Sequence, residues 1–434
     1  MNMLAIIGFA LIILLMYVLI TEKMAPPVAF IIFPIIAAFI AGSGISEVSE
    51  FIGTGLETVL DTAVLFLFSI SYFTLMSEQG LFDPMVDWVV EKVGKNIAMI
   101  FLAVLVVVVV AHLDGSGASS YLITIPAFKP IMDRLKVEPT HFLGTVIAMM
   151  SAMNIIPWGG PTIRAATVAG VEVFDIYKGI LPAVMVMFGV AIAIALFYAN
   201  RTKAKLTKDG NMDLGGLAGA IEEKELPVGK SLYMANLVLT VVMLACLFLD
   251  IGLPMHFIFM LAFAIALVIN FKSVKEQNAQ IKHYGVNAIN MTMTLFAVGI
   301  FMGVIQDSGM VDAMATSIIN LLPDAFAPHM HWFIALFSVP LMMVLGTDAF
   351  YYAMLPIVIG IVGPFGITPE QAASTLLITG TYGTYISPTV AANYVGVTLA
   401  GTTIGEHIRK NLPIMWASSI VVLILATLLG AVPF

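Results

Sequence analysis

Long apolar runs, each about the length of a membrane-spanning helix, alternate with short polar segments along most of this chain. A run of roughly 18 or more apolar residues is long enough to cross a bilayer as a helix. In the first half such runs predict spans at 3–21, 27–44, 60–78 and 176–199. A matching set in the second half predicts spans at 231–250, 254–271, 286–305 and 410–432. The pattern predicts an all-helical, polytopic membrane protein with two similar halves.

Polar, helix-breaking residues interrupt the remaining apolar stretches at four places, namely 113–119, 154–162, 346–351 and 387–393. In lipid, non-helical backbone is tolerated only where protein or a water-filled cavity satisfies its polar groups. One such break alone is equally consistent with a kink that neighbouring helices accommodate. Four breaks in two matching pairs favour a substrate site near the membrane midplane.

Two kinds of interrupted element lie between the third and the last span of each half. One predicts a re-entrant hairpin, near 97–135 and 330–363, and the other predicts a broken helix, near 140–172 and 370–397. Each half then has five crossings and one hairpin. Because five is odd, the second repeat enters the membrane in the opposite direction, so the repeats are predicted to be inverted. The two hairpin tips then approach from opposite sides and meet near the middle.

The halves also match in residues. Gly80 matches Gly309 at an offset of 229 positions, and Pro161 matches Pro388 at an offset of 227. Such landmarks indicate a duplicated unit. We predict a first repeat at 1–200, with scaffold spans in 1–95 and a hairpin and broken-helix transport part in 96–200. A linker at 201–230 is followed by a second repeat at 231–434, with scaffold spans in 231–325 and a transport part in 326–434.

Composition supports the membrane interpretation. Hydrophobic residues make up 60% of the chain and charged residues 11%, and the mean hydropathy is +1.02, too little polarity for a soluble protein of this length. The 19 Lys and Arg residues form no basic face, which argues against nucleic-acid binding. Cys246, the one cysteine, excludes an intrachain disulfide or a cysteine-based metal cluster.

Positive charges predict the orientation. The segment 201–230 carries six Lys and Arg residues, so the positive-inside rule places it in the cytoplasm and both termini on the other side. The run 3–20 lacks the charged start and the cleavage site of a signal peptide, so we expect a retained helix. A multi-pass protein of the plasma (inner) membrane is expected.

The breaks offer groups for both an anion and a cation. Prolines remove donors and glycines permit sharp turns, so each helix stops and restarts, with Thr162 as the expected N-cap of the first restart. A restarted helix presents unpaired N–H groups to a carboxylate, while freed carbonyls suit a cation. The expected substrate-binding residues are Ser116, Gly117, Ser119, Asn154, Gly159, Gly160, Thr162, Arg164, Thr347, Asp348, Tyr351, Ser387, Thr389 and Asn393.

Ionisable residues inside apolar spans are costly and therefore informative. Arg164 is expected either to bind a substrate carboxylate with its fork of donors or to neutralise Asp114. Asp114 and Asp348 are expected to bind a metal or the coupling ion, with capping of the hairpin turns as the alternative. Asp61 is a further candidate for the metal or the coupling ion. His112 is expected to be a hydrogen-bonded structural residue.

The strings at 113–117, 154–162, 348–352 and 405–410 resemble those of the citrate-metal:proton symporter family, CitMHS, and the resemblance runs the length of the chain. It implies proton-driven uptake of citrate complexed to a divalent metal. It also implies the fold of the ion transporter superfamily, in which hairpins and broken helices form a mobile domain that moves, as an elevator, against a dimerising scaffold. A homodimer is expected.

Two departures from that family fall at the predicted site. Relatives have a second acid in the first tip where this chain has Ser116, which removes a hard oxygen ligand of the kind Mg or Ca prefers. The segment 389–393 is also more polar than in relatives. A related di- or tricarboxylate, or citrate with sodium, therefore stays an alternative. Beyond co-transported Mg, Ca or Na, no cofactor is expected.

Two other functional classes fit the sequence less well. An intramembrane hydrolase with Ser116 as nucleophile and His112 as base needs no paired repeat, and no His-Glu-x-x-His string occurs. A channel would be expected to present a ring of like groups instead of two opposed hairpins. We therefore expect a transporter and not an enzyme.

Overall fold

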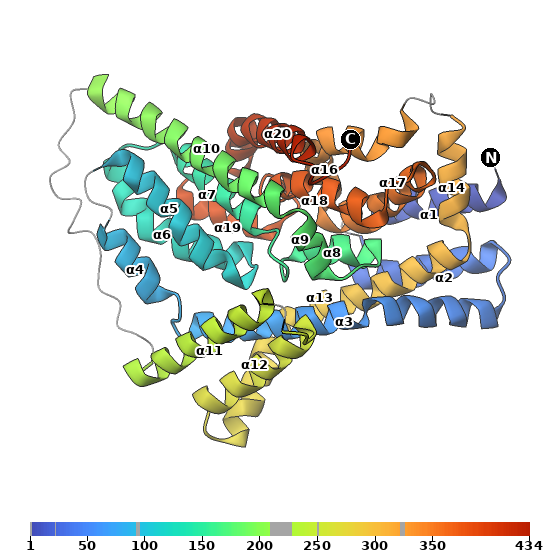
Figure 1. Cartoon of the computed structure of the whole chain (residues 1–434), viewed down its shortest axis with the longest axis horizontal. Helices are drawn as coiled ribbons and strands as arrows, with labels where there is room; N and C mark the ends of the chain where they lie inside the picture. The colour runs from blue at the N-terminus through green and yellow to red at the C-terminus, as the bar shows by residue number, and fades with distance from the viewer. Residues whose placement is uncertain (1, 22, 93–95, 209–227, 250, 322–325) are drawn as a thin grey trace.

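The computed structural model describes residues 2–21, 23–92, 96–208, 228–249, 251–321 and 326–434 (Figure 1). All regular secondary structure in these ranges is helical. Seven helices of the described part are long and apolar enough to cross a membrane, which confirms the prediction of a helical membrane protein. Most of the predicted linker, at 209–227, lies outside the described residues.

The described helices of the first half run from residue 3 to residue 208. They are α1 (Met3–Ile20), α2 (Pro26–Ile40), α3 (Ile45–Glu78), α4 (Asp83–Lys92), α5 (Ile97–Ala111), η1 (His112–Asp114), α6 (Gly117–Arg134), α7 (Pro139–Met153), α8 (Gly160–Ala169), α9 (Val173–Gly179) and α10 (Leu181–Lys208).

The helices of the second half follow the same order. They are α11 (Lys230–Phe248), α12 (Met255–Asn270), α13 (Val274–Asp307), α14 (Met310–Ile319), η3 (Ala327–His329), α15 (Met330–Leu336), α16 (Ser338–Asp348), η4 (Ala349–Met354), α17 (Leu355–Val362), η5 (Gly363–Phe365), α18 (Pro369–Thr384), α19 (Ala391–Ala400) and α20 (Ile404–Leu428).

Helix lengths repeat along with helix order. The long helices α3 and α13 each have 34 residues and begin 229 positions apart, at Ile45 and Val274. The short helices α8 and α19 each have 10 residues, and both end on a glycine in the left-handed conformation, Gly170 and Gly401. The duplication seen in the sequence therefore extends to matching elements.

Three spans differ most from their predicted bounds. Helix α3 starts at Ile45 instead of 60, because the Glu47 carboxylate accepts the backbone N–H of Gly44 at 2.7 Å and caps a polar first turn. Helix α13 likewise starts at Val274, since Ser273 and Glu276 form a capping box. The span 176–199 is divided by Ile180 between α9 and α10, and α10 continues to Lys208, so the first residues of the predicted linker are helical.

Helices α3 and α13 pack along each other through the middle of the molecule (Figure 1). Gly55 lies against Gly299, and Phe51, one turn earlier, lies against Gly303, one turn later, so the two helices are antiparallel. Any Cβ at Gly55 or Gly303 would collide with the carbonyl oxygen of the facing helix. Helices α2 and α12 pack against this pair, with α1 on α2 and α11 on α12.

The hairpins and broken helices form a second group of packed helices. Helix α10 packs on α5 and α7, α6 packs on α19, and α18 packs on α16 and α20. Helix α8 contacts both groups, since it touches α3 on one side and α18 and η4 on the other. This short helix therefore lies where the two groups meet.

Candidate functional site

The first hairpin turns at Gly115, which has a left-handed φ of 70°. The Asp114 carboxylate accepts the backbone N–H of Ser116 at 2.8 Å, and the Ser116 hydroxyl caps α6 by accepting the N–H of Ser119 at 3.3 Å. Asp114 therefore has the capping role that was the alternative to ion binding.

The first helix break separates α7 from α8 as predicted, but its cap differs. The N-cap of α8 is Gly159, and Thr162 lies inside the first turn as the third helical residue. The prediction that Thr162 caps the helix was wrong because Pro161, which has no N–H, is accommodated in the first turn and moves the start towards Gly159.

The second hairpin bends at Gly346, the first residue of the predicted break at 346–351. Gly346 has φ 73° and ψ 170°, a conformation that favours glycine, and Thr347 and Asp348 are already helical. Gly115 and Gly346 are 231 positions apart, so the two tips align at glycine. Asp114 precedes its glycine whereas Asp348 follows its own, which explains why the two acids align poorly in the sequence.

The second helix break separates α18 from α19, whose N-cap is Val390. Asn393 satisfies carbonyls that the break frees, since its Nδ2 donates to Thr384 O at 3.0 Å and to Ser387 O at 2.8 Å. The Ser387 hydroxyl donates to Met343 O of α16 at 3.1 Å and lies 2.7 Å from the Thr389 hydroxyl. These contacts connect the break to the second hairpin.

Both hairpin tips touch helix breaks. At the first tip, the Trp158 indole donates to Leu113 O at 2.6 Å, and Gly117 faces the ring of Tyr385 in the second break. At the second tip, Gly346 faces the Thr389 hydroxyl. The structure thus brings together the four interruptions that the sequence placed in two halves.

Arg164 pairs with Asp348 and not with Asp114. Its Nε donates to Asp348 Oδ1 at 2.9 Å, and its guanidinium lies 5.8 Å from the Tyr352 ring centroid. The Arg164 side chain is 9% exposed and that of Asp348 is 26% exposed. This ion pair joins the first broken helix to the second hairpin, so it connects the two halves of the chain next to the breaks.

A cavity of about 530 Å³ opens beside the first tip. It is bounded by α3 on one side and by the first tip and the start of α8 on the other. Its carboxylates are Asp114 and Glu78, and no Lys or Arg is among the described residues that line it. Glu78 Oε1 lies 2.9 Å from His283 Nε2. The predicted site residues that line the cavity are Ser116, Gly117, Ser119 and Gly160.

Asp61 lies in a different cavity, of about 270 Å³, between α3, α12 and the turn from α8 to α9. Its side chain is 65% exposed and lies 3.9 Å from the His256 imidazole. The structure does not bring Asp61 to the hairpin tips. Within the described ranges no group of three or more His, Cys, Asp and Glu residues is arranged to hold a metal ion.

Several predicted site residues have a buried polar atom without a hydrogen-bond partner in the described structure. They include Asn154 Nδ2, Thr162 Oγ1 and Tyr351 Oη. Because buried polar groups are nearly always hydrogen-bonded, such atoms beside two helix breaks are available to a ligand.

Sequence reasoning missed three residues at the site. Glu78 ends a predicted span beside the Gly80 landmark, so its position was a usable signal. Trp158 lies within the predicted break at 154–162 but was not singled out there, and Tyr385 lies two residues before the predicted break at 387–393. His112 has the structural role expected of it, with both ring nitrogens bonded, Nδ1 to Ser120 Oγ at 2.6 Å and Nε2 to Tyr385 Oη at 3.3 Å.

Comparison with solved structures identifies a related fold. The crystal structure of the Alcanivorax borkumensis YdaH transporter, described as having an unusual topology, superposes with a TM-score of 0.56 over 91% of this chain and 90% of that one. Sequence identity is 14%, so the likeness concerns the fold alone.

Sequence comparison identifies the family. The family model described as "Citrate transporter", CitMHS, matches residues 2–383. A Bacillus subtilis (strain 168) protein named citrate transporter is 33% identical over 434 residues, and each chain is covered completely. The Mg(2+)/citrate complex secondary transporter of the same organism is 31% identical, with 99% of each chain covered. This chain therefore belongs to the CitMHS citrate transporter family and is a membrane transporter, not an enzyme.

Proposed function

We propose that this protein is a secondary active transporter that imports citrate as a complex with a divalent metal, coupled to a proton or sodium gradient. Family membership supports this proposal, as do the two relatives named for citrate and for its magnesium complex. A related di- or tricarboxylate is the alternative cargo.

The charge of the cavity at the first tip is the observation that carries the proposal. Asp114 and Glu78 line this cavity without a Lys or Arg among its described lining residues. Free citrate would meet two carboxylates there, and the like charges repel one another. A complexed divalent cation lowers the negative charge of citrate and gives the carboxylates a favourable partner.

Backbone donors at the same cavity suit the anionic end of the cargo. Gly117, Ala118 and Ser119 begin α6, and Gly160 begins α8, and all four residues line the cavity. Helix starts carry unpaired N–H groups and a positive dipole end. In this arrangement the metal faces Asp114, while citrate oxygens face the two helix starts. Citrate supplies most of the metal ligands.

The remaining predicted site residues contact the cargo when it lies between the two helix breaks. The polar atoms of Asn154, Thr162 and Tyr351 become hydrogen-bonded when cargo lies between the breaks. Arg164 then binds a citrate carboxylate, and Asp348 binds the metal or the coupling ion. The other contacts come from Gly159, Thr347, Ser387, Thr389 and Asn393.

The coupling cation has a candidate route of its own. The cavity at Asp61 is also lined by Glu57 and Glu172, so it attracts cations. It lies between the α3–α13 group and α8, which carries Arg164 in its middle. We assign Asp61 to the coupling ion on this basis.

Transport follows an elevator mechanism in this proposal. The repeats at 1–200 and 231–434 are inverted. The first three spans of each half, which include the antiparallel α3–α13 pair, form the scaffold, in 1–95 and 231–325. The hairpins and broken helices at 96–200 and 326–434 form the moving unit. We propose a homodimer in the plasma (inner) membrane, with the 201–230 segment in the cytoplasm and both termini outside.

Uptake of labelled citrate into proteoliposomes tests the proposal across a panel of Mg, Ca, Na and pH gradients. We expect saturable uptake that requires a divalent metal and a proton or sodium gradient. Uptake that is unchanged by a chelator would contradict the metal complex and favour citrate with sodium. A conductance without saturation would contradict the carrier itself.

A further inference from the structure

We propose that Tyr385 is a positioning residue that holds the first hairpin tip in its cargo-binding form. The inference rests on the proposed function, because it concerns the same cavity. Tyr385 is the first residue of the second helix break and caps the C-terminus of α18. A residue of the second repeat thus sets the geometry of a tip that belongs to the first.

A directed chain of hydrogen bonds joins Tyr385 to the tip. The Ser120 hydroxyl donates to Ser116 O at 2.8 Å and therefore accepts from His112 Nδ1 at 2.6 Å. With its proton on Nδ1, His112 accepts from the Tyr385 hydroxyl at Nε2, at 3.3 Å. The peptide between Asp114 and α6 is thereby held at the carbonyl of Ser116, while the N–H of Ser116 donates to Asp114 Oδ1 at 2.8 Å.

The aromatic ring of Tyr385 supports the same tip by contact. A Cβ at Gly117 would lie 2.8 Å from Tyr385 Cε1, so the ring lies directly against the first residue of α6. The rings of His112 and Tyr121 stand nearly perpendicular to it, with centroids 5.9 and 6.3 Å away. His112 and Tyr121 are buried, as is Tyr385 itself.

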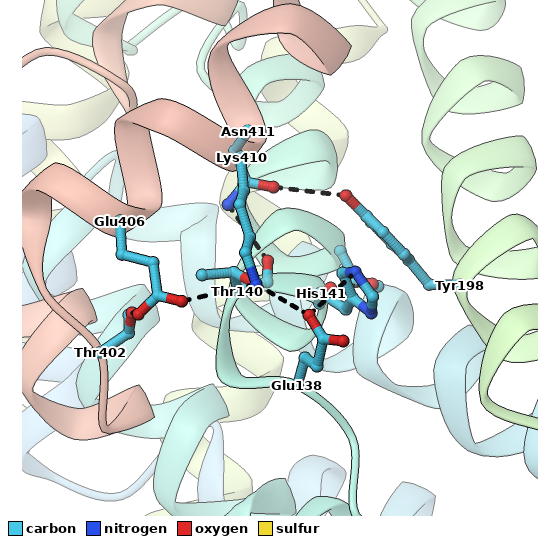
Figure 2. A network of polar contacts seen from close by, with 9 residues as sticks. Glu138, Thr140, His141, Tyr198, Thr402, Glu406, Lys410 and Asn411 are labelled. Atoms are coloured by element: carbon cyan, nitrogen blue, oxygen red, sulfur yellow. Dashed lines mark hydrogen bonds and ion pairs between the residues drawn. The ribbon is translucent and has the colours of Figure 1, made fainter. Parts of the chain in front are cut away.

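The backbone of Tyr385 is anchored from the opposite side. His407 Nε2 donates to Tyr385 O at 2.9 Å, and Asn411 Nδ2 donates to His407 Nδ1 at 3.0 Å. Asn411 also donates to Thr140 O at 3.1 Å and accepts from the Tyr198 hydroxyl at 3.3 Å (Figure 2). Helices α7, α10 and α20 therefore fix the carbonyl of Tyr385, while its hydroxyl reaches the tip.

These contacts assign separate tasks to the two ends of one residue. The carbonyl, held by His407, keeps the second break in place within its helix group. The hydroxyl orients His112, and through Ser120 it orients the tip that presents Asp114 and the α6 N–H groups. Loss of the hydroxyl alone should loosen the tip without unfolding the break.

The test is uptake of magnesium citrate by Tyr385→Phe in proteoliposomes. We expect KM to rise about tenfold, the effect of one lost hydrogen bond, with the maximal rate within about twofold of the wild type. The matched control is Tyr72→Phe on α3, which also removes one buried tyrosine hydroxyl, here one that lies 2.8 Å from the Thr240 hydroxyl and away from the cavity lining. This control should leave KM unchanged.

A double-mutant cycle with Ser120→Ala separates positioning from a general packing role. If the chain acts as a unit, Tyr385→Phe and Ser120→Ala each raise KM and the double variant adds little to either. Independent, fully additive effects would overturn the proposal, as would a KM for Tyr385→Phe equal to that of Tyr72→Phe.

Hydrogen exchange of the peptide 112–120 tests the inference without any cargo. Faster exchange there in Tyr385→Phe but not in Tyr72→Phe is the expected result, and equal exchange in both variants overturns it. Absence of citrate uptake by the wild-type protein would instead contradict the proposed function, so the two failures are distinguishable.

Discussion

At the scale of single residues, the Arg164–Asp348 pair has both a structural and a functional interpretation. The pair is largely buried, so removing one partner leaves a charge in a poorly solvated place, which costs on the order of 3 kcal/mol. A purely structural pair needs only opposite charges. A cargo-binding pair needs the guanidinium fork on α8 and the carboxylate at the second tip.

We predict that Arg164→Ala and Asp348→Asn each abolish citrate uptake. The exchanged variant, Arg164→Asp with Asp348→Arg, should recover much of the lost thermal stability because the charges are paired again, yet it should stay inactive. Uptake and the melting temperature are measured on the same reconstituted samples. If the exchanged variant recovered transport, the pair would have only a structural role and would not bind cargo.

We predict that the contact between Glu138 and Lys410 stabilises the protein at neutral pH and is lost in acid. Its carboxylate accepts from the Lys410 ammonium at 2.9 Å (Figure 2), and this contact lowers the pKa of Glu138 from its usual value. A lowered pKa means that the contribution is present above the unfolded-state pKa, about 4.3, and is lost as the pH falls through the lower folded-state pKa. Because the Glu138 side chain is 39% exposed, we expect less than about 1 kcal/mol.

The measurement compares the melting temperatures of wild type and Glu138→Gln between pH 7 and pH 3. The variant should melt slightly earlier at pH 7, and the difference should vanish at the acid end. A difference that persists at pH 3 would assign the effect to packing instead of charge.

At the scale of elements, the antiparallel contact of α3 and α13 depends on small residues. Gly55, Gly299 and Gly303 allow the two backbones to approach until no Cβ fits between them. Close approach of this kind gives strong van der Waals packing in a membrane, where apolar burial between helices contributes little. The pair is therefore expected to be rigid.

We predict that Gly55→Ala destabilises the protein by about 1–3 kcal/mol, because the methyl group forces the helices apart. Gly53→Ala is the matched control, since Gly53 lies on the same helix and a methyl group added there would meet no atom within 4 Å. Thermal melting in detergent measures both. Equal stability of the two variants would show that the helix pair tolerates separation.

At the scale of the whole molecule, the cavity at the first tip lies between two groups of helices. Ser77 of α3 and Leu122 of α6 line the same cavity from opposite groups. If the groups move relative to each other during transport, a bridge across this cavity holds them in one arrangement.

We predict that linking Ser77→Cys to Leu122→Cys with a short cross-linker, in a Cys246→Ser background, stops uptake. The link should be reversible when a reducible reagent is used, and uptake should return on reduction. Each single-cysteine variant treated with the same reagent is the control. Continued transport by the fully cross-linked protein would rule out relative motion at this cavity.

The sequence by itself determined the membrane-helical class, because apolar runs of spanning length leave few alternatives. It also located the four interruptions, since proline and glycine act locally through the backbone at 115, 157–161, 346 and 388. The sequence also indicated a duplicated unit for the same reason, because Gly80 and Gly309 are local turn signals at matching positions of the two halves.

Only the tertiary structure decided the partners. The sequence offered Asp114 as the acidic partner of Arg164, whereas the fold pairs Arg164 with Asp348, which lies 184 positions away in the chain. Asp61 lies in an apolar run, as the acids of the hairpin tips do, and was expected to bind the same ions. Helix α3 instead places it in a separate cavity. Glu78 and Tyr385 entered the site region because packing of distant helices brought them there. Local residues such as proline and glycine determine where a helix ends, whereas long-range packing determines which helix ends lie together.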